Sequence, residues 1–216
     1  MIKGIIFDLD GTLIDSMGVW YGVDRKFLAE NNVVPPENIS EIMKTLSIDK
    51  AAEFFVNEFK LNCTTEYVIK RIEKMVADEY MYNIQLKEGV IELLDYLDSK
   101  DIPYCIATAT YKMLAQAVLK RCGIYDRFKF ILTGEDIKTG KTSPDIYFEC
   151  SEKLGFSPDE TMIIEDSLHC VKTAVSAGFY TIAVYDNAAE NEWNEICRLA
   201  DRNLLKISEI KNELEK

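Results

Sequence analysis

Histidine and basic residues are scarce in this chain of 216 residues. It contains one histidine, and its 25 lysines and arginines are outnumbered by 37 aspartates and glutamates, which gives a formal net charge of −12 at pH 7. One histidine cannot build a histidine-rich metal site. The acidic excess argues against sequence-independent binding to nucleic acid or to an anionic membrane, so we expect neither as a partner.

Paired cysteines and long apolar runs are missing as well. The six cysteines are scattered, with no Cys-x-x-Cys pattern, and are interpreted as reduced, mostly buried thiols. No apolar run approaches the ~20 residues of a membrane-spanning helix, and the first residues do not resemble a secretion signal. We therefore expect a cytoplasmic protein. A monomer is compatible with this composition, which does not define the oligomeric state.

What the chain does contain is an alternation of short apolar runs and amphipathic segments. Runs at residues 2–8, 103–108, 130–133, 161–164 and 181–185 predict five strands, and helical spacing of apolar residues lies between the later ones. Strands that alternate with helices form a doubly wound, mostly parallel α/β sheet. The residues after the last predicted strand are expected to form helices that cover this sheet.

The interval between the first two predicted strands is too long for a simple connection. A crossover between parallel strands needs only about a dozen residues and one helix. Residues in this interval, such as Ala51, Phe54, Phe55 and Phe59, follow helical spacing instead. We predict a helical cap domain at residues 16–86 and an α/β core domain formed by residues 1–15 and 87–216.

Acidic and hydroxyl side chains follow three of the predicted strands. Asp8 and Asp10 follow the first strand, Thr108 and Thr110 the second, and the pair Glu165 and Asp166 the fourth. In open parallel sheets, ligands bind outside the carboxyl ends of the strands. Because a buried carboxylate needs a compensating partner, the two aspartates indicate either a cation site or a nucleophile paired with an acid.

Four short motifs stand at or near the ends of these strands. Residues 8–13 read Asp-Leu-Asp-Gly-Thr-Leu, residues 106–110 Ile-Ala-Thr-Ala-Thr, residues 140–141 Gly-Lys, and residues 163–167 Ile-Ile-Glu-Asp-Ser. In order and spacing this set resembles the phosphatase branch of the haloacid dehalogenase-like superfamily, and in particular its beta-phosphoglucomutase-like subgroup. The resemblance implies a Rossmann-like core with a helical cap inserted between the first two motifs.

The resemblance also implies a magnesium-dependent phosphatase reaction. By similarity, Asp8 is the nucleophile that forms an aspartyl phosphate, and Asp10 is the general acid and base. The implied catalytic residues are Asp8, Asp10, Thr108 and Lys141, and the implied phosphate-binding residues are Leu9, Asp10, Thr108, Ala109 and Lys141. The implied ligands of Mg²⁺ are Asp8, the main-chain carbonyl of Asp10, Asp166 and Glu165. Glu165 is implied either as a direct ligand or as a residue of the outer coordination sphere. Mg²⁺ prefers such oxygen ligands.

The predicted activity is hydrolysis of a small phosphomonoester, such as a sugar phosphate, and the expected partner is a small phosphorylated metabolite. Phosphomutases of the subgroup carry a histidine and an arginine in the cap, and this chain aligns Trp20 and Ile48 with them. Hydrolysis is therefore favoured over a beta-phosphoglucomutase-type phosphomutase, which is the first alternative. The second alternative is a non-catalytic binding or regulatory protein of the same fold.

Overall fold

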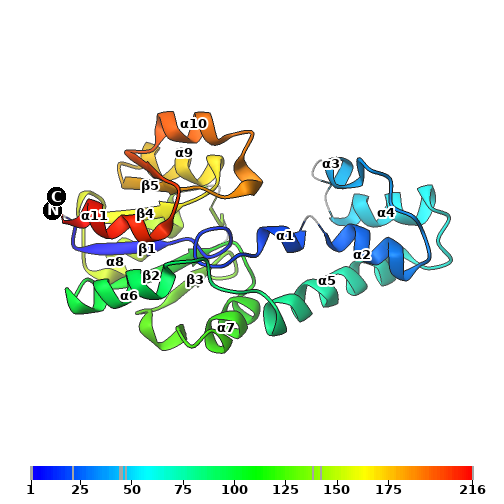
Figure 1. Ribbon diagram of the computed structural model, residues 1–216, viewed down its shortest axis with the longest axis horizontal. Coiled ribbons are helices and arrows are strands. Elements are labelled where there is room, and N and C mark those ends of the chain that lie inside the picture. The colour runs from blue at the N-terminus through cyan, green and yellow to red at the C-terminus, as the bar shows by residue number, and fades with distance from the viewer. Residues whose placement is uncertain are drawn as a thin grey trace. The chain divides into compact units, whose positions relative to one another are not determined.

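The computed structural model describes residues 2–20, 22–43, 46, 48–137, 139–141 and 143–215. The chain forms two compact units, one made of Met1–Asp15 and Ile84–Lys216 and the other of Ser16–Asn83 (Figure 1). The side chains of Trp20 and Ile48, at the two aligned cap positions, lie outside the described part. Each unit has its own packed interior.

The larger unit is built on a parallel sheet of six strands. They are β1 (Gly4–Phe7), β2 (Tyr104–Thr108), β3 (Ile131–Thr133), β4 (Thr161–Glu165), β5 (Tyr180–Val184) and β6 (Arg202–Leu204), in the spatial order β3-β2-β1-β4-β5-β6. β1 lies between β2 and β4, with Phe7 opposite both Ile106 and Ile164. The predicted parallel α/β class is confirmed, and the central place of β1 brings its carboxyl end beside those of β2 and β4.

The sixth strand corrects the prediction that only helices follow residue 185. β6 pairs in parallel with β5, and the Tyr185 amide donates to the Leu204 carbonyl at 2.9 Å. This edge strand has three residues, of which Arg202 and Asn203 are exposed. It therefore lacks the apolar run or alternation from which a strand is predicted.

Helices pack against the sheet and against one another. They are α6 (Val90–Ser99), α7 (Lys112–Arg121), α8 (Asp145–Leu154), α9 (Leu168–Ser176), α10 (Trp193–Leu199) and α11 (Ile210–Leu214), with 3₁₀ turns η1 (Tyr125–Arg127), η2 (Pro158–Glu160), η3 (Asn187–Ala189) and η4 (Ile207–Glu209). α8 packs on β1, β2 and β3, and α9 packs on β4 and β5. The core beneath α8 includes Ile6, Ala107, Ile146 and Ile163, all fully buried.

The smaller unit is helical. It contains α1 (Met17–Trp20), α2 (Val23–Glu30), α3 (Ile39–Met43), α4 (Ile48–Glu58) and α5 (Thr65–Tyr82). The ring centroids of Phe27 and Phe55 are 5.4 Å apart in its interior, and both residues are buried. Arg71 on α5 makes two hydrogen bonds, at 2.8 and 2.5 Å, to the carboxylate of Glu30 on α2. The aromatic packing and this bidentate ion pair hold α2 against its neighbours.

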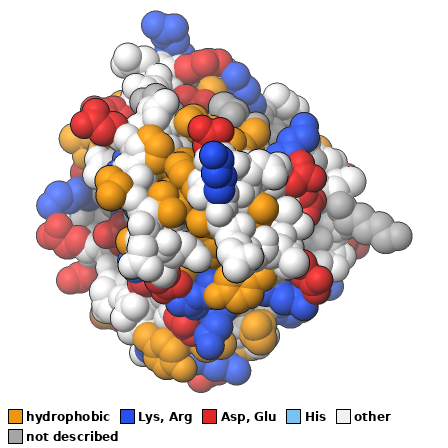
Figure 2. Space-filling model, turned by 90° about the vertical axis from the view of Figure 1, so that its right-hand side faces the viewer, with side chains coloured by type: hydrophobic (Ala, Val, Ile, Leu, Met, Phe, Trp, Pro, Cys, Tyr) orange, Lys and Arg blue, Asp and Glu red, His pale blue; other side chains and the backbone are white. Residues whose placement is uncertain are grey.

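The face of the molecule drawn in Figure 2 carries charges of both signs. Figure 2 shows acidic and basic side chains interspersed among hydrophobic ones on the face it presents. Within the described residues, no helix combines the length and apolar character needed to cross a membrane. Because the charges on that face are interspersed, the acidic excess of the chain is not gathered into one continuous patch there.

Candidate active site

Asp8 is placed at the carboxyl end of the central strand. All four residues of β1 are buried, and the Asp8 amide continues the sheet by donating to the Ile164 carbonyl at 2.9 Å. Asp8 itself is only 6% exposed. The hydrophobic strand thus places a carboxylate in a site that is largely shielded from water. Burying an ionised carboxylate costs free energy unless a cation or a hydrogen-bond donor is paired with it.

Lys141 supplies that partner. Its ammonium group contacts Asp8 Oδ1, and it lies 2.5 Å from Glu165 Oε1, so one buried cation joins the ends of β1 and β4. The Tyr147 hydroxyl, from α8, donates to the same Glu165 oxygen at 3.1 Å. Lys141 is 5% exposed and Glu165 1% exposed, so water weakens these contacts little.

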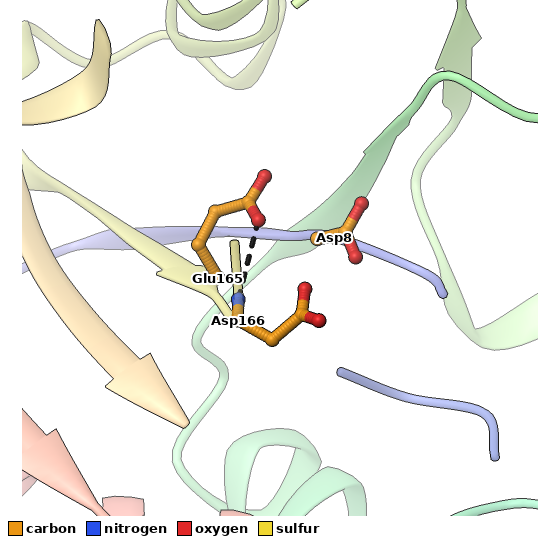
Figure 3. Close-up of side chains that lie close together, drawn as sticks. All are labelled: Asp8, Glu165 and Asp166. Carbon is orange, nitrogen blue, oxygen red and sulfur yellow. Dashed lines mark hydrogen bonds between the residues drawn. The ribbon is translucent and has the colours of Figure 1, made fainter. Parts of the chain in front are cut away.

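Three carboxylates face one another at this edge of the sheet. Figure 3 shows Asp8, Glu165 and Asp166, and one carboxylate oxygen from each lies within 4.8 Å of the other two. The Asp166 amide donates to Glu165 Oε2 at 3.2 Å, the bond drawn as a dashed line in Figure 3. Several carboxylate oxygens this close together suit a hard divalent cation, and these three residues could hold a metal ion.

The electrostatics of the site favour added positive charge. Burial is the largest cause that raises the pKa of Asp8, to about 8, with Glu165 and Asp10 acting in the same direction and Lys141 opposing them. Burial also raises the pKa of Asp166, as do the charges of Asp8 and Glu165. Although burial acts against the ammonium form of Lys141, the carboxylates of Asp8 and Glu165 raise its pKa well above the usual value. A cation bound here would favour the ionised carboxylates.

Asp10 lies in the turn that follows Asp8 and bonds to residues at and just after the end of β2. Thr110 Oγ1 donates to Asp10 Oδ2 at 2.6 Å, and Thr108 Oγ1 lies 3.5 Å from the same oxygen. The Thr110 amide in turn donates to Thr108 Oγ1 at 3.0 Å. Gly11 has φ +81°, a left-handed conformation that glycine adopts without strain. The turn is closed by the amides of Leu13 and Ile14, which both donate to the Leu9 carbonyl.

The structure therefore gathers the predicted side chains into two adjoining groups. Asp8, Lys141, Glu165 and Asp166 form the first group, and Asp10 with Thr108 forms the second. Leu9 is buried and Ala109 is exposed, each in the turn after its strand. The sequence predicts Thr110 at this edge of the sheet but assigns it no partner. Two contacts were therefore not predicted, that of Thr110 with Asp10 and that of Tyr147 with Glu165. The position of Thr110 after a strand was a signal for the first, and nothing in the sequence pattern signalled the second.

Fold and site together define an α/β protein with a buried acidic centre at the carboxyl ends of its strands. The model of the haloacid dehalogenase-like hydrolase family matches residues 5–184. Hexitol phosphatase A of Escherichia coli is 30% identical over 194 residues, 90% of this chain and 88% of that protein. The mitochondrial (DL)-glycerol-3-phosphatase 1 of Arabidopsis thaliana is 28% identical over 98% of this chain and 72% of its own length.

The chain belongs to the haloacid dehalogenase-like hydrolases, and within that family it is a phosphatase, a phosphoric monoester hydrolase. A solved structure agrees with the fold: a provisionally assigned beta-phosphoglucomutase from Thermotoga maritima superposes with a TM-score of 0.87, at 24% identity and 99% coverage of both chains. The resemblance read from the four motifs is confirmed.

Proposed function

We propose that this phosphatase hydrolyses a small sugar or polyol phosphate, depends on Mg²⁺ and forms an aspartyl phosphate on Asp8. The observation that carries the proposal is the buried Lys141 ammonium group, which touches Asp8 and Glu165 beside Asp166. The names of the bacterial and plant relatives, a hexitol phosphatase and a glycerol-3-phosphatase, support a polyol or sugar phosphate as the substrate class.

In the first step, a carboxylate oxygen of Asp8 attacks phosphorus and the bond from phosphorus to the leaving oxygen breaks. Asp10 gives a proton to that leaving oxygen, so the alcohol departs neutral. Thr110 holds the Asp10 carboxyl through the 2.6 Å hydrogen bond. In this proposal Asp8, directly after β1, is the nucleophile, and Asp10, in the turn that follows, transfers the proton.

In the second step, Asp10 takes a proton from a water molecule, whose oxygen attacks phosphorus and releases phosphate from Asp8. Lys141, Thr108 and the main-chain amides of Leu9 and Ala109 are the proposed donors to the phosphate oxygens. A bound Mg²⁺ would neutralise negative charge on the phosphoryl group and on the carboxylates. Asp8, Asp166, Glu165 and the Asp10 carbonyl are the proposed residues that hold it.

The test is phosphate release from a generic aryl phosphate, with Mg²⁺ and with a chelator. We expect the wild type to be active only with Mg²⁺, and Asp8→Asn to lose at least ~10³-fold in kcat, because an amide is a poor nucleophile. Asp15→Asn is the matched control, since Asp15 is exposed and follows the same turn. Equal rates for the wild type and Asp8→Asn would overturn the proposed mechanism.

A second measurement separates hydrolysis from phosphomutase chemistry. A mutase would convert a hexose 1-phosphate to the 6-phosphate, dependent on a bisphosphate primer, and would release little inorganic phosphate. We expect stoichiometric phosphate release and no isomer. A panel of hexitol, glycerol and hexose phosphates, compared by kcat/KM, then identifies the substrate class.

The proposal also covers the division into domains, the role of the cap, the partner and the cellular compartment. We propose that the helical insertion at residues 16–86 acts as the cap that selects the substrate, and that the core consists of residues 1–15 and 87–216. A small phosphorylated metabolite in the cytoplasm is the proposed partner. Deletion or exchange of the insertion should change the order of preference among phosphate esters while the core retains its metal site.

A further inference from the structure

Lys87 makes an enclosed set of contacts that the proposed mechanism does not use. Its ammonium group donates to the Gly11 carbonyl at 2.6 Å, to the Tyr185 carbonyl at 3.0 Å and to Asp186 Oδ2 at 2.9 Å. An ammonium group has three protons, so all three are used. The side chain of Lys87 is 19% exposed and that of Asp186 is 8% exposed, so this ion pair is shielded from water.

These contacts join three segments that are far apart in the sequence. Gly11 belongs to the turn after β1, Tyr185 and Asp186 follow β5, and Lys87 lies in the returning segment that leads into α6. The backbone of Lys87 is fixed to the same turn, because its amide donates to the Leu13 carbonyl at 3.0 Å. One residue earlier, Leu86 forms an antiparallel bridge with Ile14. The main chain that carries the Lys87 side chain is therefore fixed to the turn after β1.

The residue that Lys87 restrains is the neighbour of Asp10. The Gly11 carbonyl follows the Asp10 α-carbon by one peptide unit, so fixing that carbonyl fixes the main chain on which the Asp10 carboxyl is carried. On its other side the Asp10 carboxyl is held by Thr110. Asp10 is thus restrained at the side chain by a hydroxyl group and, through the carbonyl of the next residue, by a partly buried cation. A general acid needs this kind of fixed geometry.

We propose that Lys87 is a positioning residue for Asp10, acting through the Gly11 carbonyl rather than by touching the substrate. This inference rests on the proposed role of Asp10 as general acid and base. Loss of the ammonium group would release the carbonyls of Gly11 and Tyr185 and leave Asp186 without its cation. The turn would then sample positions in which Asp10 is displaced from the leaving oxygen.

The test compares Lys87→Ala with Lys206→Ala in the aryl phosphate assay with Mg²⁺. Lys206 pairs with Glu88, the next residue after Lys87, at 3.3 Å, but both side chains of that pair are exposed, so it is a matched control. Since misplacement by about 1 Å can cost about 100-fold, we expect kcat of Lys87→Ala to fall about 10- to 100-fold. KM should change less than about threefold, and Lys206→Ala should retain kcat within about twofold.

Chemical rescue distinguishes positioning from a general loss of structure. n-Propylammonium can enter the space left by the truncated side chain and donate to the same oxygens, so it should restore kcat of Lys87→Ala by several-fold. Tetramethylammonium has no N–H group and should have no effect at the same ionic strength. A kcat within twofold of wild type, or a loss shared by kcat and KM without rescue, would overturn the proposal.

Hydrogen exchange keeps the inference separate from the proposed function. In Lys87→Ala the amides of Gly11, Leu13 and Ile14, whose hydrogen bonds close the turn, should exchange faster than in wild type, while those of β4 should be unchanged. If the wild type released no phosphate, the proposed function would fail, and faster exchange would still support the role of Lys87 in holding the turn. Unchanged exchange at these amides would contradict that role.

Discussion

Replacing Lys141 with methionine tests how the buried charges are balanced. The substitution keeps most of the side-chain volume and removes the only contact of a cation with both Asp8 and Glu165 among the described residues. Breaking a buried ion pair by removing one partner costs about 3–5 kcal/mol, because the remaining charge is left unpaired. Here two carboxylates lose the same cation, so we expect a loss in free energy of unfolding at the upper end of that range.

The assay is urea unfolding at pH 8 in the presence of a chelator. Lys172→Met is the control, because Lys172 pairs with Glu195 at 2.6 Å with both side chains about half exposed, and such surface pairs contribute about 0–1 kcal/mol. Mg²⁺ should restore part of the stability of Lys141→Met, since a ligand present at 100 times its Kd adds about 2.7 kcal/mol. A loss no larger than that of Lys172→Met would refute the charge balance described for this site.

Two further predictions concern the same site. Tyr147→Phe removes the 3.1 Å hydrogen bond to Glu165, and should cost about 1–2 kcal/mol of unfolding free energy and lower kcat, whereas the exposed Tyr111→Phe should be neutral. Burial raises the pKa of Asp8 to about 8 in the native protein. Between the ordinary pKa of an aspartate and about pH 8, the native carboxyl therefore holds a proton that the unfolded chain has lost. In chelator, thermal stability should therefore fall as pH rises from 5 to about 8, and Asp8→Asn should weaken this dependence; a pH profile identical in both proteins would contradict the assignment.

The parts of the fold that sequence predicts are those with a strong local pattern. β1 is recognisable because an apolar run ends in Asp8, and the helical insertion is recognisable from the spacing of residues such as Phe54 and Phe55. β6 was missed because Arg202 and Asn203 at the sheet edge carry no apolar pattern, and only their main-chain bonds to β5 make the strand. Edge pairing of this kind depends on the three-dimensional position of the neighbouring strand.

The same distinction applies to the site. Asp8, Asp10, Glu165 and Asp166 stand at or shortly after the ends of strands, where topology alone brings them to one edge of the sheet. Tyr147 follows helical spacing and is indistinguishable in sequence from an ordinary core residue of α8, yet its hydroxyl reaches Glu165. Contacts of this kind depend on side-chain direction across elements, which residue spacing does not encode.

Direct detection of the phosphorylated Asp8 side chain tests the central claim most directly. Wild type and Asp10→Asn are mixed with a phosphorylated polyol and Mg²⁺, quenched in acid within one turnover and digested, and the peptide that contains Asp8 is weighed by mass spectrometry. We predict that this peptide gains the mass of one phosphoryl group, with fragmentation placing the group on Asp8. The label should be transient in wild type and persist longer in Asp10→Asn, which lacks the base for hydrolysis. Phosphate release without any label on this peptide, or a label on another residue, would contradict the account.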